Sequence, residues 1–372
     1  MDYSKPIRIL QVIPDMRSGG VENFIMNLYR SIDREMVQFD FVVHYKEKKF
    51  LDDEIERLGG KIYRFSLRND NNLIKYIIDL NQFYKKHREY KVVHCHWNSM
   101  GFIHLFVAKI NKVYVRIGHS HNSSAGIGTK GKIKKLMVKP YKYVTTLNMA
   151  CSNKAGIFLF GNKPFEFIPN AINVNKFRYS NQAREKIRNS LRLNKDDFLI
   201  GHVGRFNTQK NHRFLIEVFK QIYQLNHKAY LIMLGEGELL DTVKRQVRES
   251  GLEKNVFFAG VHSNMEDYYS AMDIFLLPSL YEGLPLTAVE SQASGLDTLL
   301  SDSITKQVKI NDNVYYLSNK NVRDWCDMVI KCAHGKVDRT YLNDVVERTD
   351  YNVDRLVSKV QEKYVRLYTA GQ

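Results

Sequence analysis

The sequence predicts an α/β protein with two consecutive doubly wound domains, each built on a parallel sheet. Two observations support this prediction. First, short runs rich in Val, Ile and Phe alternate with segments of helical period along the whole chain, as expected for parallel strands joined by crossover helices. Second, a chain of 372 residues is too long for one ordinary hydrophobic core and favours two domains of similar size.

The candidate strands fall into two series, separated by a polar, irregular stretch. Each strand is a short run of β-branched and other apolar residues bounded by polar or turn residues. The first series spans residues 7–13, 39–45, 61–65, 92–97, 115–121 and 165–168, and the second spans residues 198–203, 229–234, 256–260, 274–277 and 298–301. We therefore predict an N-terminal domain at residues 1–173 and a C-terminal domain at residues 182–350.

Helical periodicity is clearest in two segments. Residues 72–87 place Leu73, Ile77, Leu80 and Tyr84 at spacings of three and four, which predicts one apolar face. Residues 353–368 form a second amphipathic pattern through Val353, Leu356, Val360, Tyr364 and Leu367. We expect this C-terminal helix, within residues 352–372, to pack back on the N-terminal domain.

Composition limits the classes of function. The formal net charge of +16 calls for a polyanionic partner, an anionic membrane surface or anionic substrates. The basic residues show no helix-turn-helix, zinc-finger or aromatic-rich sheet signature, so we expect no nucleic acid partner. The chain begins without a signal-like apolar run and has no apolar stretch of the ~20 residues that span a membrane. We expect a cytoplasmic protein, or one bound peripherally at the inner face of the plasma membrane.

Ligands of open α/β sheets bind beyond the carboxyl ends of the strands, so the loops that follow the strands deserve inspection. Gly19 and Gly20 precede a helix, where backbone N–H groups can approach an anion; taken alone, a flexible turn explains them equally well. His119 and His121 end another strand, and alternation places them on the same side. No Cys, Asp or Glu completes a metal set beside them, so a hydrogen bond to a substrate hydroxyl is favoured over zinc and over a structural role.

Two loops of the C-terminal domain carry charged residues in suggestive positions. Arg205 follows a strand and Lys210 stands at the mouth of the next helix, which places two cations beside free N–H groups and suits a diphosphate. Glu282 lies in a later loop, before a helix that begins at Pro285 and runs to about Ser294. Glu290 falls inside this apolar helix, where a partly buried carboxylate requires a partner.

Taken together, these motifs resemble the donor site of glycosyltransferase family 4. Gly204-Arg205 with Lys210, followed by Glu282-Gly283-Leu284-Pro285 and Glu290, matches the order and spacing of that site, including Glu-x7-Glu. The resemblance covers nearly the whole chain, and the runs 209–212 and 301–305 are similar to those of bacterial exopolysaccharide and capsule members. Leu284 and Pro285 stand where many family members have an aromatic residue and a glycine.

The resemblance implies a GT-B fold, in which two Rossmann-like domains face each other across a cleft, and a retaining hexosyltransferase. Arg205 and Lys210 would neutralise the donor diphosphate, Glu290 would accept hydrogen bonds from the ribose, and Glu282 would face the transferred sugar. His121 would touch this sugar from the other domain, with His119 as its substitute, and Gly19 and Gly20 would admit acceptor and diphosphate. The sugar and phosphate would also be held at Gly283, Leu284, Pro285, Leu286 and Thr287.

The resemblance also implies the substrates. We expect a hexose or N-acetylhexosamine donated by a nucleotide-sugar, UDP before GDP, to a glycan such as a lipid-linked polysaccharide repeat unit. The nucleotide-sugar is a substrate, so no cofactor is expected. No metal is expected either, because the chain lacks the Asp-x-Asp motif of metal-dependent transferases.

Two other functions compete with this one. A nucleotide-sugar epimerase shares the GT-B architecture but needs several carboxylates for proton abstraction, whereas the N-terminal loops offer mainly His, Arg and Lys. A basic membrane-binding or nucleic-acid-binding protein with a degenerate donor site is the other alternative, and the complete set of two cations and two glutamates argues against it.

A lysine-rich segment suggests contact with an anionic membrane. Apolar residues at Ile133, Leu136 and Met137 are surrounded by Lys130, Lys132, Lys134, Lys135, Lys139 and Lys142. If helical, this segment resembles an interfacial helix. A lysine-rich helix packed on its own sheet would show the same pattern.

Overall fold

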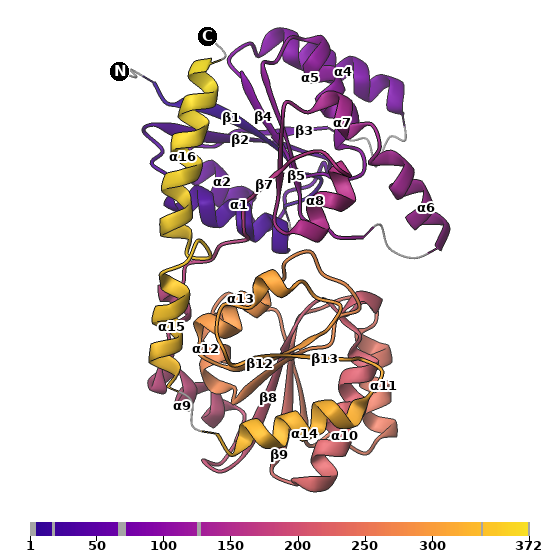
Figure 1. The fold of residues 1–372 in the computed structure, drawn as a ribbon, viewed down its shortest axis with the longest axis vertical. Helices are drawn as coiled ribbons and strands as arrows, with labels where there is room; N and C mark the ends of the chain where they lie inside the picture. Colours follow the sequence, from indigo (N-terminus) through magenta and orange to yellow (C-terminus); the bar gives the residue numbers. More distant parts are fainter. Residues whose placement is uncertain (1–4, 17–18, 66–71, 125–127, 336–337, 371–372) are drawn as a thin grey trace. The chain divides into compact units, whose positions relative to one another are not determined.

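We analysed a computed structural model of the chain, which describes residues 5–16, 19–65, 72–124, 128–335 and 338–370 (Figure 1). The chain forms two compact units. Unit 1 comprises Met1–Ala171 together with Val353–Gln372, and unit 2 comprises Ile172–Asn352. Each unit contains one parallel sheet with helices on both faces, which confirms the predicted fold class of two Rossmann-like α/β domains.

Unit 1 is built on a seven-stranded sheet with the order β3-β2-β1-β4-β5-β6-β7. The first three strands in the chain lie on one side of the switch in strand order, and the remaining strands lie on the other, so β1 and β4 are neighbours there. Such a switch opens a crevice at the carboxyl ends of the strands. The strands are β1 (Ile7–Val12), β2 (Val37–Val43), β3 (Ile62–Arg64), β4 (Val92–Cys95), β5 (Val115–Ser120), β6 (Leu147–Ala150) and β7 (Glu166–Phe167).

Helices cover both faces of this sheet and form a core on each. One face packs against α1 (Gly20–Ser31), α2 (Asp52–Arg57) and α16 (Val353–Ala370). The other face packs against α4 (Leu73–Lys86), α5 (Gly101–Ile110), α7 (Tyr141–Val144) and α8 (Asn153–Phe160). The lysine-rich helix α6 (Gly128–Met137) precedes α7. None of the described helices combines the length and the apolar character of a bilayer-spanning segment.

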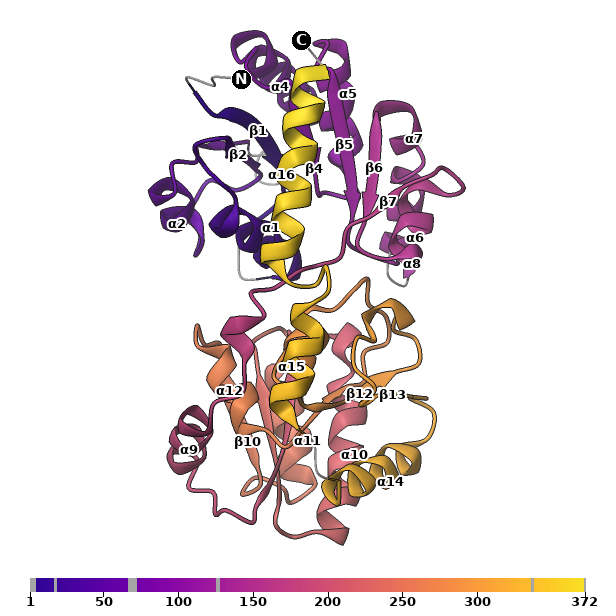
Figure 2. The same cartoon turned by 60° about the vertical axis from the view of Figure 1, so that its left-hand side comes forward.

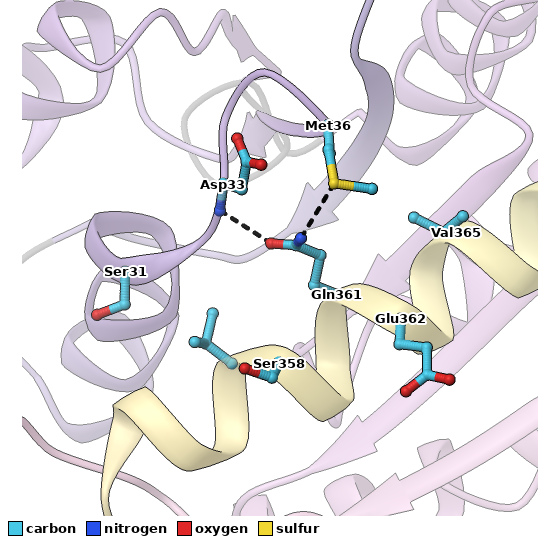
Figure 3. A pocket seen from close by; sticks show the side chains of 8 residues that line it. Ser31, Asp33, Met36, Ser358, Gln361, Glu362 and Val365 are labelled. Carbon is cyan, nitrogen blue, oxygen red and sulfur yellow. Dashed lines mark hydrogen bonds between the residues drawn. The ribbon is translucent and has the colours of Figure 1, made fainter. Parts of the chain in front are cut away.

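The C-terminal helix α16 lies beside α1 in unit 1 (Figure 1 and Figure 2). Its buried residues Val353, Leu356, Val360 and Tyr364 join the core that α1 shares with the sheet. Gln361 links α16 to the turn before β2, because its side-chain oxygen accepts a hydrogen bond from the Asp33 N–H at 2.9 Å and its amide donates to the Met36 sulfur (Figure 3). These contacts lie at the rim of a pocket of about 430 Å³.

Unit 2 is built on a six-stranded sheet with the order β10-β9-β8-β11-β12-β13, in which β8 and β11 flank the switch. Its strands are β8 (Phe198–Val203), β9 (Ala229–Leu234), β10 (Val256–Gly260), β11 (Ile274–Leu277), β12 (Asp297–Ser301) and β13 (Val314–Leu317). Its α-helices are α9 (Asn181–Ser190), α10 (His212–Leu225), α11 (Leu240–Glu249), α12 (Met265–Ala271), α13 (Leu286–Ala293), α14 (Val322–Ala333) and α15 (Arg339–Glu347), and its 3-10 turns are η1 (Asn175–Phe177), η2 (Thr208–Lys210) and η3 (Lys306–Val308).

The strand predictions differ from the structure in two main respects. The predicted strands of unit 2 occur within one residue of their predicted bounds, but β6 and β13 were not predicted. Both are only four residues long, and β6 contains no β-branched residue. Strands β4 and β5 end before residues 96 and 121, so His96 and His121 stand in the loops rather than in the strands.

The predicted apolar face of α4 was only half right. Leu80 and Tyr84 are buried, but the other members of the buried face are Tyr76 and Phe83. Leu73 and Ile77 remain 42% and 38% exposed. The large aromatic rings bury more apolar area against the sheet than the aliphatic residues would, so the helix turns them inward. Several aliphatic side chains of α4 therefore face solvent.

Candidate functional site

In unit 2, the loops after β8 and β11 lie together at the switch in strand order. The Leu280 N–H donates to the Gln209 carbonyl at 2.8 Å, and the Asn211 side chain donates to the Pro278 carbonyl at 3.2 Å. These contacts join segments about seventy residues apart in sequence. The two charged loops singled out from the sequence therefore form one site at the carboxyl end of the sheet.

Lys210 and Glu282 form an ion pair in this site. Lys210 Nζ lies 2.7 Å from Glu282 Oε1, and the two side chains are only 13% and 10% exposed. Gln209 Nε2 donates to the other carboxylate oxygen at 3.1 Å. Lys210 ends the turn η2, where its backbone N–H bonds to the Asn207 side chain. The lysine is thus held by its backbone and by its charge partner at the mouth of the site.

Arg205 stands in a different environment. Its side chain is 65% exposed, and its Nε lies 3.6 Å from the carboxylate of the exposed Glu238. An exposed pair of this kind contributes ~0–1 kcal/mol. The guanidinium can therefore leave Glu238 for an anionic ligand at little cost in stability.

Glu290 lies inside α13, as predicted, and its partner is Tyr269. The Tyr269 hydroxyl donates to Glu290 Oε2 at 2.8 Å, and burial of the carboxyl group raises the pKa of Glu290 to about 7. Pro285 precedes the helix, and no side chain caps its N-terminus. The first turn, from Leu286 and Thr287 onward, therefore presents backbone N–H groups together with the positive end of the helix dipole.

The sequence analysis missed two glycines that shape this site. Gly235 and Gly237 follow β9 with φ of +134° and +155°, values that favour glycine. A Cβ atom at Gly235 would lie 2.2 Å from the Gly204 carbonyl oxygen, and one at Gly237 would lie 2.5 Å from the Phe206 carbonyl oxygen. The loop after β9 thus packs backbone against backbone on the loop that carries Arg205. A Gly-x-Gly sequence directly after a strand was the available signal.

In unit 1, a pocket of about 330 Å³ lies among the loops that follow β1, β4 and β5. Pro14 after β1 and Glu22 of α1 line one part of it, and polar residues of the loops after β4 and β5 also line it: His96, Asn98, Asn122 and Ser124. Gly19 precedes α1 with an extended φ of −120°, and a Cβ atom added at Gly20 would meet no other atom within 4 Å. Neither glycine is required by the backbone conformation, so their predicted role in admitting ligands stays a prediction.

His119 and His121 lie on the same side of the sheet, with ring centroids 4.1 Å apart. His119 is fully buried. His121 lies deeper than the sequence suggested, since its Nδ1 is 3.2 Å from Asn170 Oδ1 and its Nε2 is 2.9 Å from His96 Nδ1. Burial lowers the pKa of His121 to about 4, so the ring is neutral. To touch a sugar, His121 would have to give up one of these two contacts.

His94 and His96 were not singled out from the sequence, although the His-x-His pattern at the end of β4 repeats that of His119 and His121. The two pairs lie on neighbouring strands, so all four rings meet. Burial lowers the pKa of His94 to about 3 and that of His96 well below its usual value.

Comparison with known proteins agrees with the fold. The family model described as glycosyl transferases group 1 matches residues 183–344. EpsF of Bacillus subtilis (strain 168), named as a glycosyltransferase, is 31% identical over 369 residues that cover 96% of each chain. The UDP-Gal:alpha-D-GlcNAc-diphosphoundecaprenol alpha-1,3-galactosyltransferase of Escherichia coli is 24% identical over 93% of this chain and 94% of its own.

Two further proteins complete the comparison. The capsular polysaccharide biosynthesis glycosyltransferase CapH of Staphylococcus aureus is 28% identical over 82% of this chain and 84% of its own. The crystal structure of Anabaena HepE in complex with UDP-glucose superposes with a TM-score of 0.80 at 15% identity, covers 96% of this chain and 99% of that chain, and shows the shared fold. With this fold and these relatives, the chain belongs to the group 1 glycosyltransferases of the GT-B fold, of the type that builds bacterial polysaccharides.

Proposed function

We propose that this glycosyltransferase moves a hexose or N-acetylhexosamine from a UDP-sugar to a lipid-linked polysaccharide repeat unit with retention of configuration. The observation that carries this proposal is the cluster in unit 2, where the Lys210–Glu282 ion pair and Glu290 accompany the uncapped N-terminus of α13, and Arg205 stands in the neighbouring loop after β8. Cations and free N–H groups suit a diphosphate, and the two carboxylates suit the hydroxyl groups of two sugars.

Each charged group has a distinct part in the proposed reaction. Lys210 carries three N–H donors and uses one on Glu282, so it can keep this carboxylate while binding a phosphate oxygen. Arg205 would swing from Glu238 onto the diphosphate. As the bond to the sugar breaks, negative charge grows on the departing phosphate, and such a contact stabilises the transition state by ~3–4 kcal/mol. Glu290 would accept hydrogen bonds from the ribose hydroxyls.

Retention would follow from substitution on one face of the sugar. The departing phosphate oxygen would take the proton of the acceptor hydroxyl while the new glycosidic bond forms on the same face, and Glu282 would hold the donor sugar. Positive charge comes from Arg205, Lys210 and the N-terminus of α13, so we propose that the reaction needs no divalent metal at the diphosphate. His121 could assist from unit 1 only after releasing Asn170 or His96.

The choice of substrates rests on the relatives. By its printed name, the relative from Escherichia coli uses UDP-galactose and an acceptor on diphosphoundecaprenol. It aligns with nearly the whole of this chain, which favours UDP over GDP and a lipid-linked acceptor.

We also propose that the enzyme works on an anionic membrane through one face of unit 1. The apolar residues Ile133 and Leu136 of α6 are 55% and 64% exposed, which is unexpected for a helix that only packs on its own sheet. Helix α5 contacts both α4 and α7, and Lys109 of α5 donates to the Tyr143 carbonyl of α7 at 3.0 Å. We propose that the exposed side chains of α4, α5 and α7, together with those of α6, which directly precedes α7 in the chain, form one extended surface.

We call this surface the basic apolar face. Its exposed apolar residues are Ile74, Ile78, Phe106, Ile110, Ile133, Leu136 and Tyr143, and its exposed lysines are Lys75, Lys109, Lys132, Lys135, Lys139 and Lys142. The side chains of Lys130 and Lys134, also predicted to take part, lie outside the described residues. Each lysine near an anionic bilayer contributes ~1 kcal/mol, so several together suffice for reversible binding.

The activity is tested with a panel of UDP-sugars and GDP-sugars, with and without a lipid-diphosphate-linked acceptor. We expect transfer from one UDP-sugar, and the product should keep the anomeric configuration of the donor in its NMR spectrum. Transfer from GDP-sugars alone, or an inverted product, would contradict the proposal.

Membrane binding is tested separately by cosedimentation with vesicles. Binding should require anionic lipid, fall as salt rises, and weaken at least 10-fold when Lys132, Lys135 and Lys139 become Glu. The matched control carries the same charge change in unit 2, at Lys195, Lys220 and Lys254, which are also exposed. If both triple variants lose binding equally, net charge rather than the basic apolar face is responsible.

A further inference from the structure

Four histidines meet in the core of unit 1. His94 and His96 come from the end of β4, and His119 and His121 come from the end of β5, which is its neighbour. Ring centroids of adjacent members lie 4.1 to 5.2 Å apart. We call this group the histidine array. No more than 6% of any member is exposed.

The outward nitrogen of three rings meets an oxygen atom. His94 Nδ1 lies 2.6 Å from the Tyr364 hydroxyl, and His96 Nε2 lies 2.9 Å from Gln11 Oε1. His121 Nδ1 lies 3.2 Å from Asn170 Oδ1. A neutral imidazole has one N–H, and in a metal site this N–H is usually donated to an outer oxygen. With the N–H groups placed outward, the inward nitrogens carry lone pairs.

The inward nitrogens then face one another. His96 Nδ1 and His121 Nε2 are 2.9 Å apart, and His94 Nε2 and His119 Nδ1 are 3.1 Å apart. Each contact is an N–H···N hydrogen bond if one of the two rings carries its proton inward, whereas with both protons outward two lone pairs face each other and need a cation between them. Two ligand nitrogens on one tetrahedral zinc ion are separated by about 3.3 Å, from a zinc–nitrogen bond of about 2.0 Å. The observed separations are close to that value.

We propose that the histidine array binds one Zn²⁺ ion. One ring nitrogen from each of His94, His96 and His119 lies within 4.8 Å of the others, so these three histidines are the proposed ligands. The fourth position is left for a water molecule or, after a small movement, for His121 beside His96. Imidazole suits zinc, and Tyr364, Gln11 and Asn170 would orient the ligands from outside. The ion would tie the carboxyl ends of β4 and β5 together.

The surroundings of the array fit this proposal. His96 lines the pocket of about 330 Å³, which gives an ion a path from solvent. Phe24 packs against three of the rings. The remaining ring nitrogen, His119 Nε2, is buried and makes no hydrogen bond of normal geometry, although it is weakly attracted to the Ile168 carbonyl. If zinc bound Nδ1 of His119, the proton of this ring would be on Nε2, and the positive ion would make that N–H a stronger hydrogen-bond donor.

A metal-free arrangement also exists. If the Gln11 amide were turned by 180°, its NH₂ group would donate to His96, and His96 could then donate to His121. As placed, the Gln11 NH₂ group points to the Tyr364 hydroxyl at 3.4 Å. The two arrangements differ in whether the histidine array can bind zinc. Only the arrangement with the Gln11 oxygen facing His96 leaves inward lone pairs that converge on a metal ion.

The experiment uses the full chain without a histidine tag, stripped by chelation and titrated with Zn²⁺ by calorimetry. We expect one zinc per chain, a rise in the thermal midpoint, and visible absorption of a four-coordinate site when Co²⁺ replaces zinc. His96→Asn should weaken binding at least 100-fold. Gln11→Leu, which removes an outer oxygen, should weaken it about 10- to 100-fold.

The matched control is His104→Asn, a buried histidine of the same unit that bonds to Tyr84 on the other face of the sheet. It should bind zinc like the unchanged chain. Circular dichroism verifies that each variant is folded. Failure of the unchanged chain to take up stoichiometric zinc overturns the proposal whether or not the variants fold, and so does equal binding by His96→Asn and the control.

Discussion

Lys210 offers the sharpest test of the donor site, because the structure gives it two separable parts. In the proposed reaction it binds the diphosphate, and in the structure it also neutralises Glu282 inside unit 2. Replacing Lys210 with Ala removes both effects. The double variant Lys210→Ala/Glu282→Gln removes the phosphate ligand without leaving an unpaired buried carboxylate. Arg205→Ala removes the other proposed phosphate ligand, whose side chain is exposed and pairs only loosely with the exposed Glu238.

The expected losses in stability of these variants follow from how deeply each replaced side chain is buried. Removing one member of a buried ion pair costs about 3–5 kcal/mol, and we expect the lower end because Gln209 still donates to Glu282. For a unit of this size, about 3 kcal/mol lowers the thermal midpoint by roughly 6–12 °C. The double variant should recover most of that loss. Arg205→Ala should change the free energy of unfolding by ~1 kcal/mol or less. All three variants should lose about 100- to 1000-fold in turnover.

Thermal unfolding and turnover of the three variants, measured side by side, distinguish the two effects. The expected pattern is one variant that is unstable and inactive and two that are stable and inactive. Near-normal turnover of both Lys210→Ala and Arg205→Ala would refute the assignment of the diphosphate site. If the single Lys210 variant were as stable as the double variant, the reasoning about the buried pair would be wrong.

Three further predictions concern the same unit. Burial raises the pKa of Glu290 to about 7, so the free energy of unfolding should fall as the pH rises from about 4.5 to 7 and this carboxyl group ionises. UDP affinity should instead increase over pH 6–8, because the ionised carboxylate accepts hydrogen bonds from the ribose better. Calorimetry at several pH values checks this, and Glu290→Gln should bind UDP more weakly and without that pH dependence. Turnover should survive EDTA within about 2-fold, and complete loss restored by Mg²⁺ or Mn²⁺ would contradict a metal-independent reaction. Gly237→Ala should destabilise unit 2 by more than ~1 kcal/mol in a denaturant titration, because the added Cβ atom would clash with the Phe206 backbone. The control Gly251→Ala should cost less, because Gly251 also has a positive φ but its Cβ atom would meet no other atom within 4 Å.

Local patterns were sufficient for most of the secondary structure and for locating the charged loops of unit 2. The strands of unit 2 are buried runs of apolar residues bounded by turns, so their ends are marked in the sequence itself. The same reasoning placed Glu290 inside a helix and required a partner for it. It could not identify Tyr269 as that partner, because the tyrosine lies on another helix, 21 residues away.

What the sequence determined by itself was the order of strands and helices and the loops that carry charge, because periodicity and turn residues act over a few neighbours. The tertiary structure alone decided which side chains meet. Lys210 pairs with Glu282 from 72 residues away, and His96 meets His121 from 25 residues away. Both contacts depend on which strands become neighbours and in which register. Strand order and register are settled by burial of the whole sheet, so a residue's local sequence does not reveal its partner across the sheet.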